Sequence, residues 1–380
     1  MILSKLPDVG TTIFTVMSAL AKEHNAINLS QGFPDFDCDP LLHNLAYRAM
    51  QAGHNQYPPM RGIDILSEQI AMKYNALHQL SLDPVNEITV TAGAAEAIYS
   101  AITTIVHVGD EVIVIDPAYD LYKPAIILNG GIPQPFHLKT PGFKVDWDIV
   151  EGMVNERTRL IIINTPHNPI GRTLKEDDLK ALEAIVEKTG IYVISDEVYE
   201  HLIFGGQQHE SILRYPGLFN RGFAVFSFGK TYHITGWRVG YIVAPKSLTA
   251  EFRKVHQFNV FTVPTPLQYA LAEYMKEPKH YLELPGFFEH KRNLLQEALK
   301  DSRLRPLLSE GSYFQLYDYS EISDKPDYQF VKDLTIQHGV AAIPMSVFYS
   351  NPDPSERLIR LCFGKTESTL LAAAERLSKL

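Results

Sequence analysis

Lys230 stands among side chains that could support covalent chemistry. It follows a short apolar run, residues 223–226, which predicts a buried strand. Open α/β sheets bind their ligands beyond the carboxyl ends of such strands. Ser227 and Arg238 flank the lysine with a hydroxyl and a guanidinium, the partners that a phosphate requires. The grouping indicates an amine that bonds covalently to a phosphorylated cofactor.

Two other interpretations of Lys230 have to be weighed. Gly229-Lys230-Thr231 could end a P-loop, but the first glycine of that motif would fall where the chain has Ala224. The nucleotide-binding interpretation therefore fails on spacing. The other alternative is an ordinary surface lysine in a loop. The candidate ligand groups at the ends of the other predicted strands make this alternative the weaker one.

A carboxylate and a phenol follow another predicted strand, residues 191–194. Asp196 comes after apolar residues, so it is expected to be largely desolvated and to need a cationic partner. A structural salt bridge would satisfy that need. Tyr199, three residues later on the same rim as Lys230, favours a ligand instead.

Two earlier strands also end in candidate ligand groups. Residues 88–91 lead into Gly93-Ala94-Ala95, where small residues at a helix start leave backbone N–H groups open to an anion. Simple strand–helix packing would use the same residues. Residues 111–115 end shortly before Tyr119, whose ring could stack on a planar ligand or fill the core.

A loop and a late strand complete the candidates. Residues 160–163 predict a strand, and the two prolines that follow forbid a helix and fix the polar loop around Asn168. Arg360 lies within a predicted strand, residues 358–362. Because side chains alternate along a strand, it points away from its apolar neighbours.

The elements that must position these residues alternate between strand and helix from residue 88 to residue 243. This pattern predicts an α/β fold with a doubly wound, mostly parallel sheet. The last hundred residues change to a smaller α+β unit, with strands at 313–317, 340–343 and 358–362 and helices at 328–338 and 367–380. We expect an arm over 1–40 that reaches the small domain and the site's mouth, a large domain over 41–280, and a small domain with a long linking helix over 281–380.

Composition excludes several classes of protein. With 380 residues, 45% of them hydrophobic, the chain has ample core, and its net charge of −9 argues against nucleic acid as main partner. Its two cysteines, Cys38 and Cys362, show no metal-ligand spacing and no disulfide framework, which indicates a reducing compartment. Residues 1–10 lack the apolar core of a signal peptide, and no run is long enough to span a membrane. The sequence predicts a cytoplasmic protein without a metal.

These residues, in this order, resemble the fold-type-I pyridoxal-phosphate enzymes, specifically the class I aminotransferases, over nearly the whole chain. The most specific matches are Asn168-Pro169, Asp196-x-x-Tyr199, Ser227-x-x-Lys230 and Gly236-x-Arg238. Residues 30–36 and 164–169 look like the kynurenine and glutamine aminotransferase branch. The full pattern, including residues 11–14 and 229–237, is most similar to the bacterial methionine aminotransferases.

The resemblance implies pyridoxal 5'-phosphate (PLP) as cofactor, with a homodimer that shares two active sites. Lys230 would bond to PLP and later move the substrate's proton, while Asp196 would pair with the ring nitrogen. The other implied PLP contacts are Tyr199 and Asn168 at the ring hydroxyl, Tyr119 on the ring, and Gly93, Ala94, Ala95, Ser227, Arg238 and the partner subunit's Tyr57 at the phosphate. The Asn168-Pro169 bond is expected to be cis, as is usual in the family.

For the substrate, the resemblance implies that Arg360 binds the α-carboxylate, assisted by Asn168 and the Gly32 backbone. We expect an apolar side-chain pocket, lined in part by Phe14, Phe33, Phe36 and Phe261. Branches that prefer dicarboxylates bring a partner arginine near residues 258–266, where this chain has none. The predicted activity is therefore ping-pong transfer of the amino group from methionine and other large apolar or aromatic amino acids to a 2-oxo acid.

Two alternatives remain open at this point. The first is a kynurenine/glutamine-type aminotransferase with cysteine-S-conjugate β-lyase activity, because one carbanion can either be reprotonated or eliminate a leaving group. The second is a regulator that keeps the fold as a sensor. It would need a DNA-binding segment, and the residues before Asn28 are too few and not basic enough.

Overall fold

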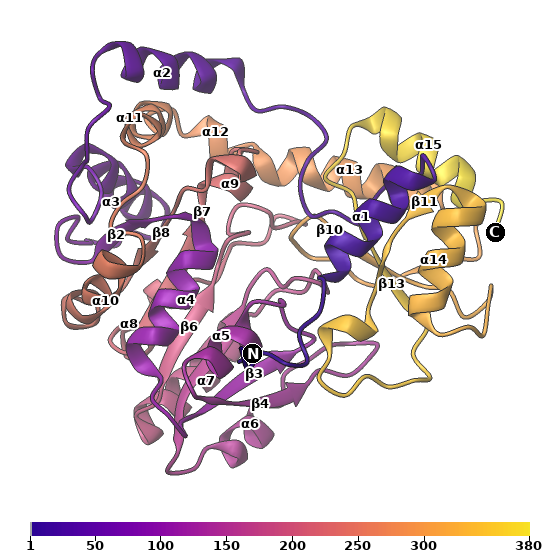
Figure 1. Ribbon diagram of the computed structural model, residues 1–380, viewed down its shortest axis with the longest axis horizontal. Helices are drawn as coiled ribbons and strands as arrows, with labels where there is room; N and C mark the ends of the chain where they lie inside the picture. Colours follow the sequence, from indigo (N-terminus) through magenta and orange to yellow (C-terminus); the bar gives the residue numbers. More distant parts are fainter. Residues whose placement is uncertain (1) are drawn as a thin grey trace.

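A seven-stranded sheet forms the centre of the larger part of the chain (Figure 1). Along the chain its strands are β2 (Ile88–Thr91), β3 (Glu111–Asp116), β4 (Ile132–His137), β5 (Thr158–Asn164), β6 (Tyr192–Asp196), β7 (Gly222–Ser227) and β8 (Gly240–Val243). Their order is β2-β8-β7-β6-β5-β3-β4, and β8 runs antiparallel to both neighbours while β7, β6, β5, β3 and β4 are parallel. The computed structural model describes residues 2–380. The predicted mostly parallel α/β sheet is confirmed.

Helices cover both faces of this sheet, and strand alternation explains why. In β3, Val112 and Val114 belong to one apolar cluster, whereas Ile113 and Ile115 belong to another. The helices of this part are α2 (Pro40–Gln51), α3 (Asp64–His78), α4 (Gly93–Ile105), α5 (Tyr122–Leu128), α6 (Trp147–Met153), α7 (Glu176–Thr189), α8 (Pro216–Phe219), α9 (Phe228–Thr231), α10 (Lys246–Asn259), α11 (Thr265–Tyr274) and α12 (Lys279–Leu282), with 3₁₀ turns at Ile212–Arg214 and Thr235–Trp237. Near-continuous apolar strands are typical of sheets buried on both faces.

Strand β4 was not predicted from the sequence, and its two prolines explain the omission. Pro133 and Pro135 lack the backbone N–H that a strand donates to its neighbours. β4 is the last strand of the sheet and pairs with β3 alone, so this loss is tolerated at its open edge.

A second, four-stranded sheet carries the C-terminal part of the chain. Its strands are β9 (Arg305–Pro306), β10 (Phe314–Asp318), β12 (Ile343–Pro344) and β13 (Leu358–Cys362), in the order β12-β13-β10-β9 with antiparallel pairing. Its helices are α13 (Leu284–Ala298), α14 (Asp327–His338) and α15 (Glu367–Leu377), with a 3₁₀ turn at Ser346–Phe348. The single strand predicted over 340–343 is in fact two, β11 (Val340–Ala341) and β12, in different sheets.

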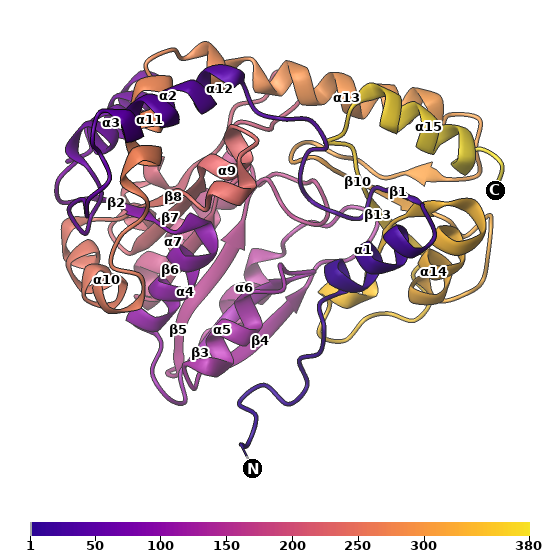
Figure 2. The ribbon, with the colours of Figure 1, turned by 45° about the horizontal axis from the view of Figure 1, so that its top comes forward.

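The N-terminal arm joins this second part. Strand β1 (Ile27–Asn28) pairs in parallel with β11, and helix α1 (Ile13–Glu23) lies beside α14 (Figure 2). The segment after β1 then leads back to α2 and the large sheet. The expected limits of the arm and the two domains stay a prediction. Within residues 2–380, no helix has the length and apolarity needed to cross a bilayer.

Candidate active site

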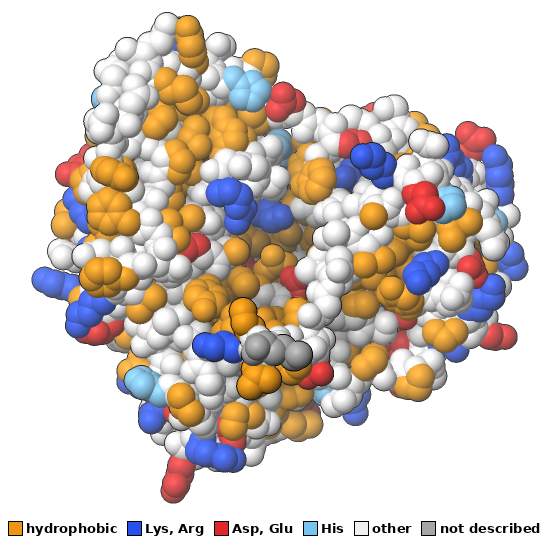
Figure 3. Space-filling view, viewed as in Figure 1, with side chains coloured by type: hydrophobic (Ala, Val, Ile, Leu, Met, Phe, Trp, Pro, Cys, Tyr) orange, Lys and Arg blue, Asp and Glu red, His pale blue; other side chains and the backbone are white. Residues whose placement is uncertain are grey.

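A cavity lies where the carboxyl ends of β5, β6 and β7 face β10 and β13. It has about 990 Å³ of empty space, open solvent at its mouth included. Figure 3 shows a hollow between the two parts of the molecule, with apolar and basic side chains around it. Most of the predicted site residues line the cavity: Phe14, Gly32, Phe33, Ala94, Ala95, Tyr119, Asn168, Asp196, Tyr199, Ser227, Lys230, Arg238 and Arg360.

Lys230 reaches the cavity from α9, directly after β7. Its Nζ donates to the backbone oxygen of Gly32 at 3.0 Å and to the hydroxyl of Tyr313 at 2.9 Å. Tyr313 also donates to the same Gly32 oxygen, at 2.5 Å. Burial lowers the pKa of Lys230 to about 8. A substantial fraction of this amine is therefore neutral near physiological pH and able to act as nucleophile or base.

Asp196 ends β6 and is held by its neighbours on the rim. The Tyr122 hydroxyl donates to Oδ2 at 2.6 Å, and the Val198 N–H donates to Oδ1 at 3.3 Å. Burial raises the pKa of Asp196 to about 6, against these two hydrogen bonds. Asn164, at the end of β5, donates to the Asp196 carbonyl at 2.8 Å and accepts from the Asn168 N–H at 2.7 Å. Two strand ends are thus locked together at the cavity.

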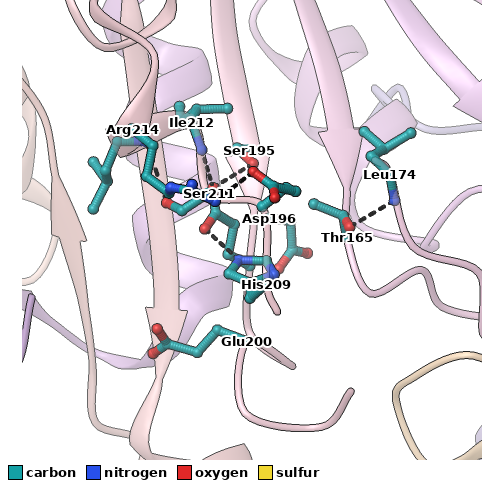
Figure 4. Close-up of polar contacts among 12 residues, drawn as sticks. Thr165, Leu174, Ser195, Asp196, Glu200, His209, Ser211, Ile212 and Arg214 are labelled. Carbon is teal, nitrogen blue, oxygen red and sulfur yellow. Dashed lines mark hydrogen bonds and ion pairs between the residues drawn. The ribbon is translucent and has the colours of Figure 1, made fainter. Parts of the chain in front are cut away.

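The neighbouring carboxylate, Glu197, makes its hydrogen bonds inside the fold, with Ser195, His209 and Ile212, which are labelled in Figure 4. It accepts from the Ser195 hydroxyl at 2.8 Å and the Ile212 N–H at 3.1 Å, and it pairs with His209 at 2.7 Å. Glu197 is fully buried and does not line the cavity. Of these two adjacent acids, Glu197 has a structural role, and only Asp196 lines the cavity, where it could contact a ligand.

The start of helix α4 forms an anion cradle. Ala94 and Ala95 line the cavity at the first turn, where backbone N–H groups have no partner within the helix. Gly93 has a φ of +73°, and a Cβ added there would lie 2.8 Å from the Arg238 guanidinium. Ser227 and Arg238 line the same end of the cavity, so backbone donors, a hydroxyl and a cation converge as a phosphate requires.

Arg360 closes the opposite wall from β13 and is fully buried. Its Nη1 donates to Asn168 Oδ1 at 2.7 Å and its Nη2 donates to the Ser30 carbonyl at 2.9 Å. The guanidinium lies 3.9 Å from the centre of the Phe314 ring. Burial lowers its pKa to about 10, which still leaves it charged. Within residues 2–380 its buried Nε has no hydrogen-bond partner, so the guanidinium keeps an unsatisfied donor.

Four predicted residues do not line this cavity within one chain: Tyr57, Phe261, Phe36 and Gly93. Tyr57 is 84% exposed and packs edge-on against Phe261, with ring centres 5.6 Å apart. Phe36 packs against His233 and Phe287, at 5.1 and 5.6 Å between ring centres. Gly93, in contrast, lies directly beside Arg238, which does line the cavity. The other two predicted pocket phenylalanines, Phe14 and Phe33, are in place.

Sequence reasoning missed Tyr313, Tyr122 and Asn164, which fix Lys230 and Asp196. Asn164 could have been found, because it is a polar residue at the carboxyl end of a predicted strand. Tyr122 and Tyr313 give no such signal, since a tyrosine in a helix or strand looks like an ordinary core residue. The Asn168-Pro169 bond is cis, as predicted.

Comparison with known proteins identifies the class. The sequence model of the family "Aminotransferase class I and II" matches residues 24–377, so the chain belongs to that family and is an aminotransferase. It is 55% identical to the methionine aminotransferase of Escherichia coli K12 over 99% of this chain and 98% of that protein. It is 32% identical to human kynurenine–oxoglutarate transaminase 1, over 95% and 93% of the two chains.

Solved structures agree in fold. YbdL from Escherichia coli, whose structure and reactivity identify a methionine aminotransferase function, superposes with a TM-score of 0.98 at 54% identity over 100% of both chains. The N-succinyldiaminopimelate aminotransferase of Mycobacterium tuberculosis superposes with a TM-score of 0.96 at 35% identity, again over 100% of both chains. The names of these relatives give different amino-acid substrates, so the shared fold does not determine the substrate. The side chains of the site must do so.

Proposed function

We propose that this aminotransferase takes methionine and other large apolar or aromatic amino acids as donors and a 2-oxo acid as acceptor. One observation carries the proposal: three cations line the cavity, Lys230, Arg238 and Arg360, and each already has a task. Arg238 lies at the anion cradle, Lys230 at the reacting centre, and Arg360 fits the α-carboxylate. No cation among the lining residues is left for an acidic substrate side chain.

The residues present fit PLP. Arg238, Ser227 and the start of α4 match its phosphate, and Asp196 matches a protonated ring nitrogen because its carboxylate is buried at the strand end. Tyr119, Tyr199 and Asn168 also line the cavity. Tyr119 would stack on the ring, and Tyr199 and Asn168 would donate to its hydroxyl. When bound, PLP supplies an electron sink for the carbanion that forms at the substrate's α-carbon.

The chain's own residues then bind, orient and move a proton. Arg360 and Asn168 hold the α-carboxylate, so the α-carbon faces Lys230. The amine, with its pKa near 8, removes the proton from the α-carbon and delivers it to the bound cofactor. Such proton transfer by a positioned base is worth roughly 10²–10⁴-fold in rate. The Gly32 carbonyl and the Tyr313 hydroxyl hold Nζ at the position from which it acts. Both half-reactions use the same site, which makes the kinetics ping-pong.

The substrate side chain lies against aromatic rings in this proposal. Phe14 and Phe33 line the cavity near Gly32, and an apolar wall favours a thioether or an aromatic ring. The methionine aminotransferase relative, at 55% identity, supports the same assignment. Phe36 and Phe261 stay predicted members of the pocket, Phe261 as part of the edge that a second subunit would bring.

We further propose a cytoplasmic homodimer. Tyr57 and Phe261 form an exposed aromatic pair outside their own cavity, which suits residues that complete a partner's site. Both cysteines are buried and unpaired, in keeping with a reducing compartment. The other partners in this proposal are small molecules, the amino-acid and 2-oxo-acid substrates, with neither nucleic acid nor membrane involved.

Kynurenine transaminases at 32–34% identity support a second candidate, the kynurenine/glutamine type with β-lyase side activity. The test is product analysis with the purified holoenzyme. Methionine plus a 2-oxo acid should give the 2-oxo acid of methionine and one new amino acid in equal amounts. Faster transamination of kynurenine than of methionine, or release of pyruvate and ammonia from a cysteine S-conjugate, would favour the second candidate instead.

A further inference from the structure

Three potential metal ligands meet at the start of helix α2, away from the residues that line the active-site cavity. Cys38 Sγ and His43 Nε2 are 3.1 Å apart, and His43 Nε2 and Asp37 Oδ1 are 3.6 Å apart. All three ligand atoms lie within 4.8 Å of one another. Sequence spacing did not suggest the site, because one cysteine, one carboxylate and one histidine match no established metal motif.

The separations of 3.1 and 3.6 Å are near those between ligands of a tetrahedral zinc ion. Zinc binds sulfur at about 2.3 Å, imidazole nitrogen at about 2.0–2.1 Å and carboxylate oxygen at about 2.0–2.2 Å, which places tetrahedral ligands about 3.3–3.6 Å apart. A thiol hydrogen bond to the imidazole would account for the Cys38–His43 contact. Asp37 adds a carboxylate oxygen within 4.8 Å of both, so the three side chains together offer a sulfur, a nitrogen and an oxygen ligand.

The local backbone holds the ligands in this arrangement. Asp37 Oδ1 accepts from the Cys38 N–H at 2.8 Å, and Asp39 caps α2 by accepting from the Leu41 N–H at 2.8 Å. His43 therefore projects from the first turns of a capped helix. Cys38 is buried, whereas Asp37 and His43 are exposed, so an ion can enter from solvent.

We propose that Asp37, Cys38 and His43 bind one zinc ion, with water as the fourth ligand. Binding replaces the thiol proton of Cys38, which leaves to solvent. The thiolate and the carboxylate then balance the charge of Zn²⁺. Three protein ligands and one water are typical of an open zinc site.

The ion would fasten a segment that forms part of the active-site wall. Gly32 and Phe33 line the cavity a few residues before the ligands. Further along, Asp35 accepts from the Thr366 N–H and the Thr369 hydroxyl, both at 2.6 Å, which ties the segment to α15. Zinc would tie Asp37 and Cys38 to His43 of α2. The segment would then be held by both parts of the molecule.

The test uses chelator-treated holoenzyme returned to zinc. We expect one zinc per chain by elemental analysis after desalting, and X-ray absorption showing one sulfur neighbour at about 2.3 Å. Cys38→Ser, His43→Gln and Asp37→Asn should each weaken binding at least tenfold. Asp37 is exposed and Asn can keep the bond from Cys38 N, so the last variant should fold.

His107→Gln is the matched control. His107 is exposed and lies 3.7 Å from the half-buried Asp110, and neither cysteine is beside this pair. This change should leave stoichiometry and affinity unaltered. Zinc with nitrogen and oxygen neighbours alone, unchanged binding in folded Cys38→Ser, or less than 0.1 zinc per chain at about micromolar free zinc would each overturn the proposal.

Discussion

Burial moves two ionisable groups of the site toward neutral pH from opposite sides. It lowers the pKa of Lys230 to about 8 and raises that of Asp196 to about 6. In both cases the charged form loses hydration that the cavity wall does not fully replace. Pairs of groups shifted in this way are typical of sites that transfer protons. The proposed chemistry uses the shift of Lys230, because this amine must lose a proton to act as nucleophile or base. Asp196 must be ionised opposite a cationic ring, and the charge of that ring would offset the cost of burying the carboxylate.

Removing the amine tests its assignment. Lys230→Ala should still bind PLP, because the cradle at α4, Ser227 and Arg238 are untouched, but transamination should fall by roughly 10²–10⁴-fold or more. In the unchanged protein, borohydride should fix PLP to Lys230. Peptide mapping by mass spectrometry checks the position, and label on another lysine would contradict the assignment.

The shifted pKa also predicts a pH dependence. A neutral amine is needed to bond with PLP, so the rate of cofactor attachment to the apo chain should rise with pH. With a pKa near 8, the neutral fraction rises about tenfold between pH 7 and pH 9; an unshifted lysine would give about a hundredfold rise. Absorbance of the yellow product gives the rate, and a rise near a hundredfold would mean that burial has not lowered this pKa.

At the scale of elements, the site is an assembly of strand ends and one helix start. β5, β6 and β7 deliver Asn164, Asp196 and Ser227, while α4 presents backbone donors. The position of α4 depends on Glu96, whose carboxylate accepts from the Ala92 N–H at 3.1 Å and the Ser100 hydroxyl at 2.7 Å. Strand ends and a helix start thus hold these particular groups, while Gly32, Asn168 and Arg238 reach the cavity from the segments between elements.

The close approach of α4 to Arg238 predicts the effect of one methyl group. Gly93→Ala would bring a Cβ to 2.8 Å from the guanidinium, so Arg238 must move and PLP affinity should fall about tenfold or more. Gly109→Ala is the control, because its φ is also positive, +88°, and nothing lies within 4 Å. Both variants should lose about 1 kcal/mol of stability from backbone strain. Equal PLP affinities, by fluorescence titration, would contradict this role of Gly93.

Sequence patterns predicted the elements that obey them and missed those that do not. Apolar runs located β5, β6 and β7, and with them the strand ends that carry Asp196 and Lys230. β4 was missed because alternating prolines hide an edge strand. Tyr313 was missed as a site residue because its contact with Lys230 joins positions 83 residues apart in sequence. Nothing local encodes such a pairing, which depends on how β10 packs against the end of β7.

At the scale of the whole molecule, the cavity depends on segments from both ends of the chain. β1 pairs with β11, which fixes the arm before Gly32 against the C-terminal part. Phe14 then faces a cavity whose opposite wall is the large sheet. Tyr57 and Phe261 are exposed and do not line the cavity of their own chain, which supports the proposed homodimer.

Mixing two defective chains tests the shared site. Lys230→Ala and Tyr57→Ala homodimers should each be weak at limiting PLP, for different reasons. In a heterodimer, one cavity would combine an intact Lys230 with the partner's Tyr57. Re-equilibrated 1:1 mixtures should recover about a quarter of the unmodified activity, since half the dimers carry one good site of two. Heterodimers seen by native mass spectrometry without recovered activity would place Tyr57 outside the partner's site.

Substrate preference tests the central claim most directly. Steady-state assays of methionine and aspartate with one common 2-oxo acid give the ratio of their kcat/KM values. The side-chain carboxylate of aspartate would be desolvated among Phe14 and Phe33 without a cationic partner, at a cost of several kcal/mol. We therefore expect methionine to be favoured by on the order of a hundredfold or more. Comparable values for the two amino acids would contradict the account, because the pocket would then have to contain a further cation.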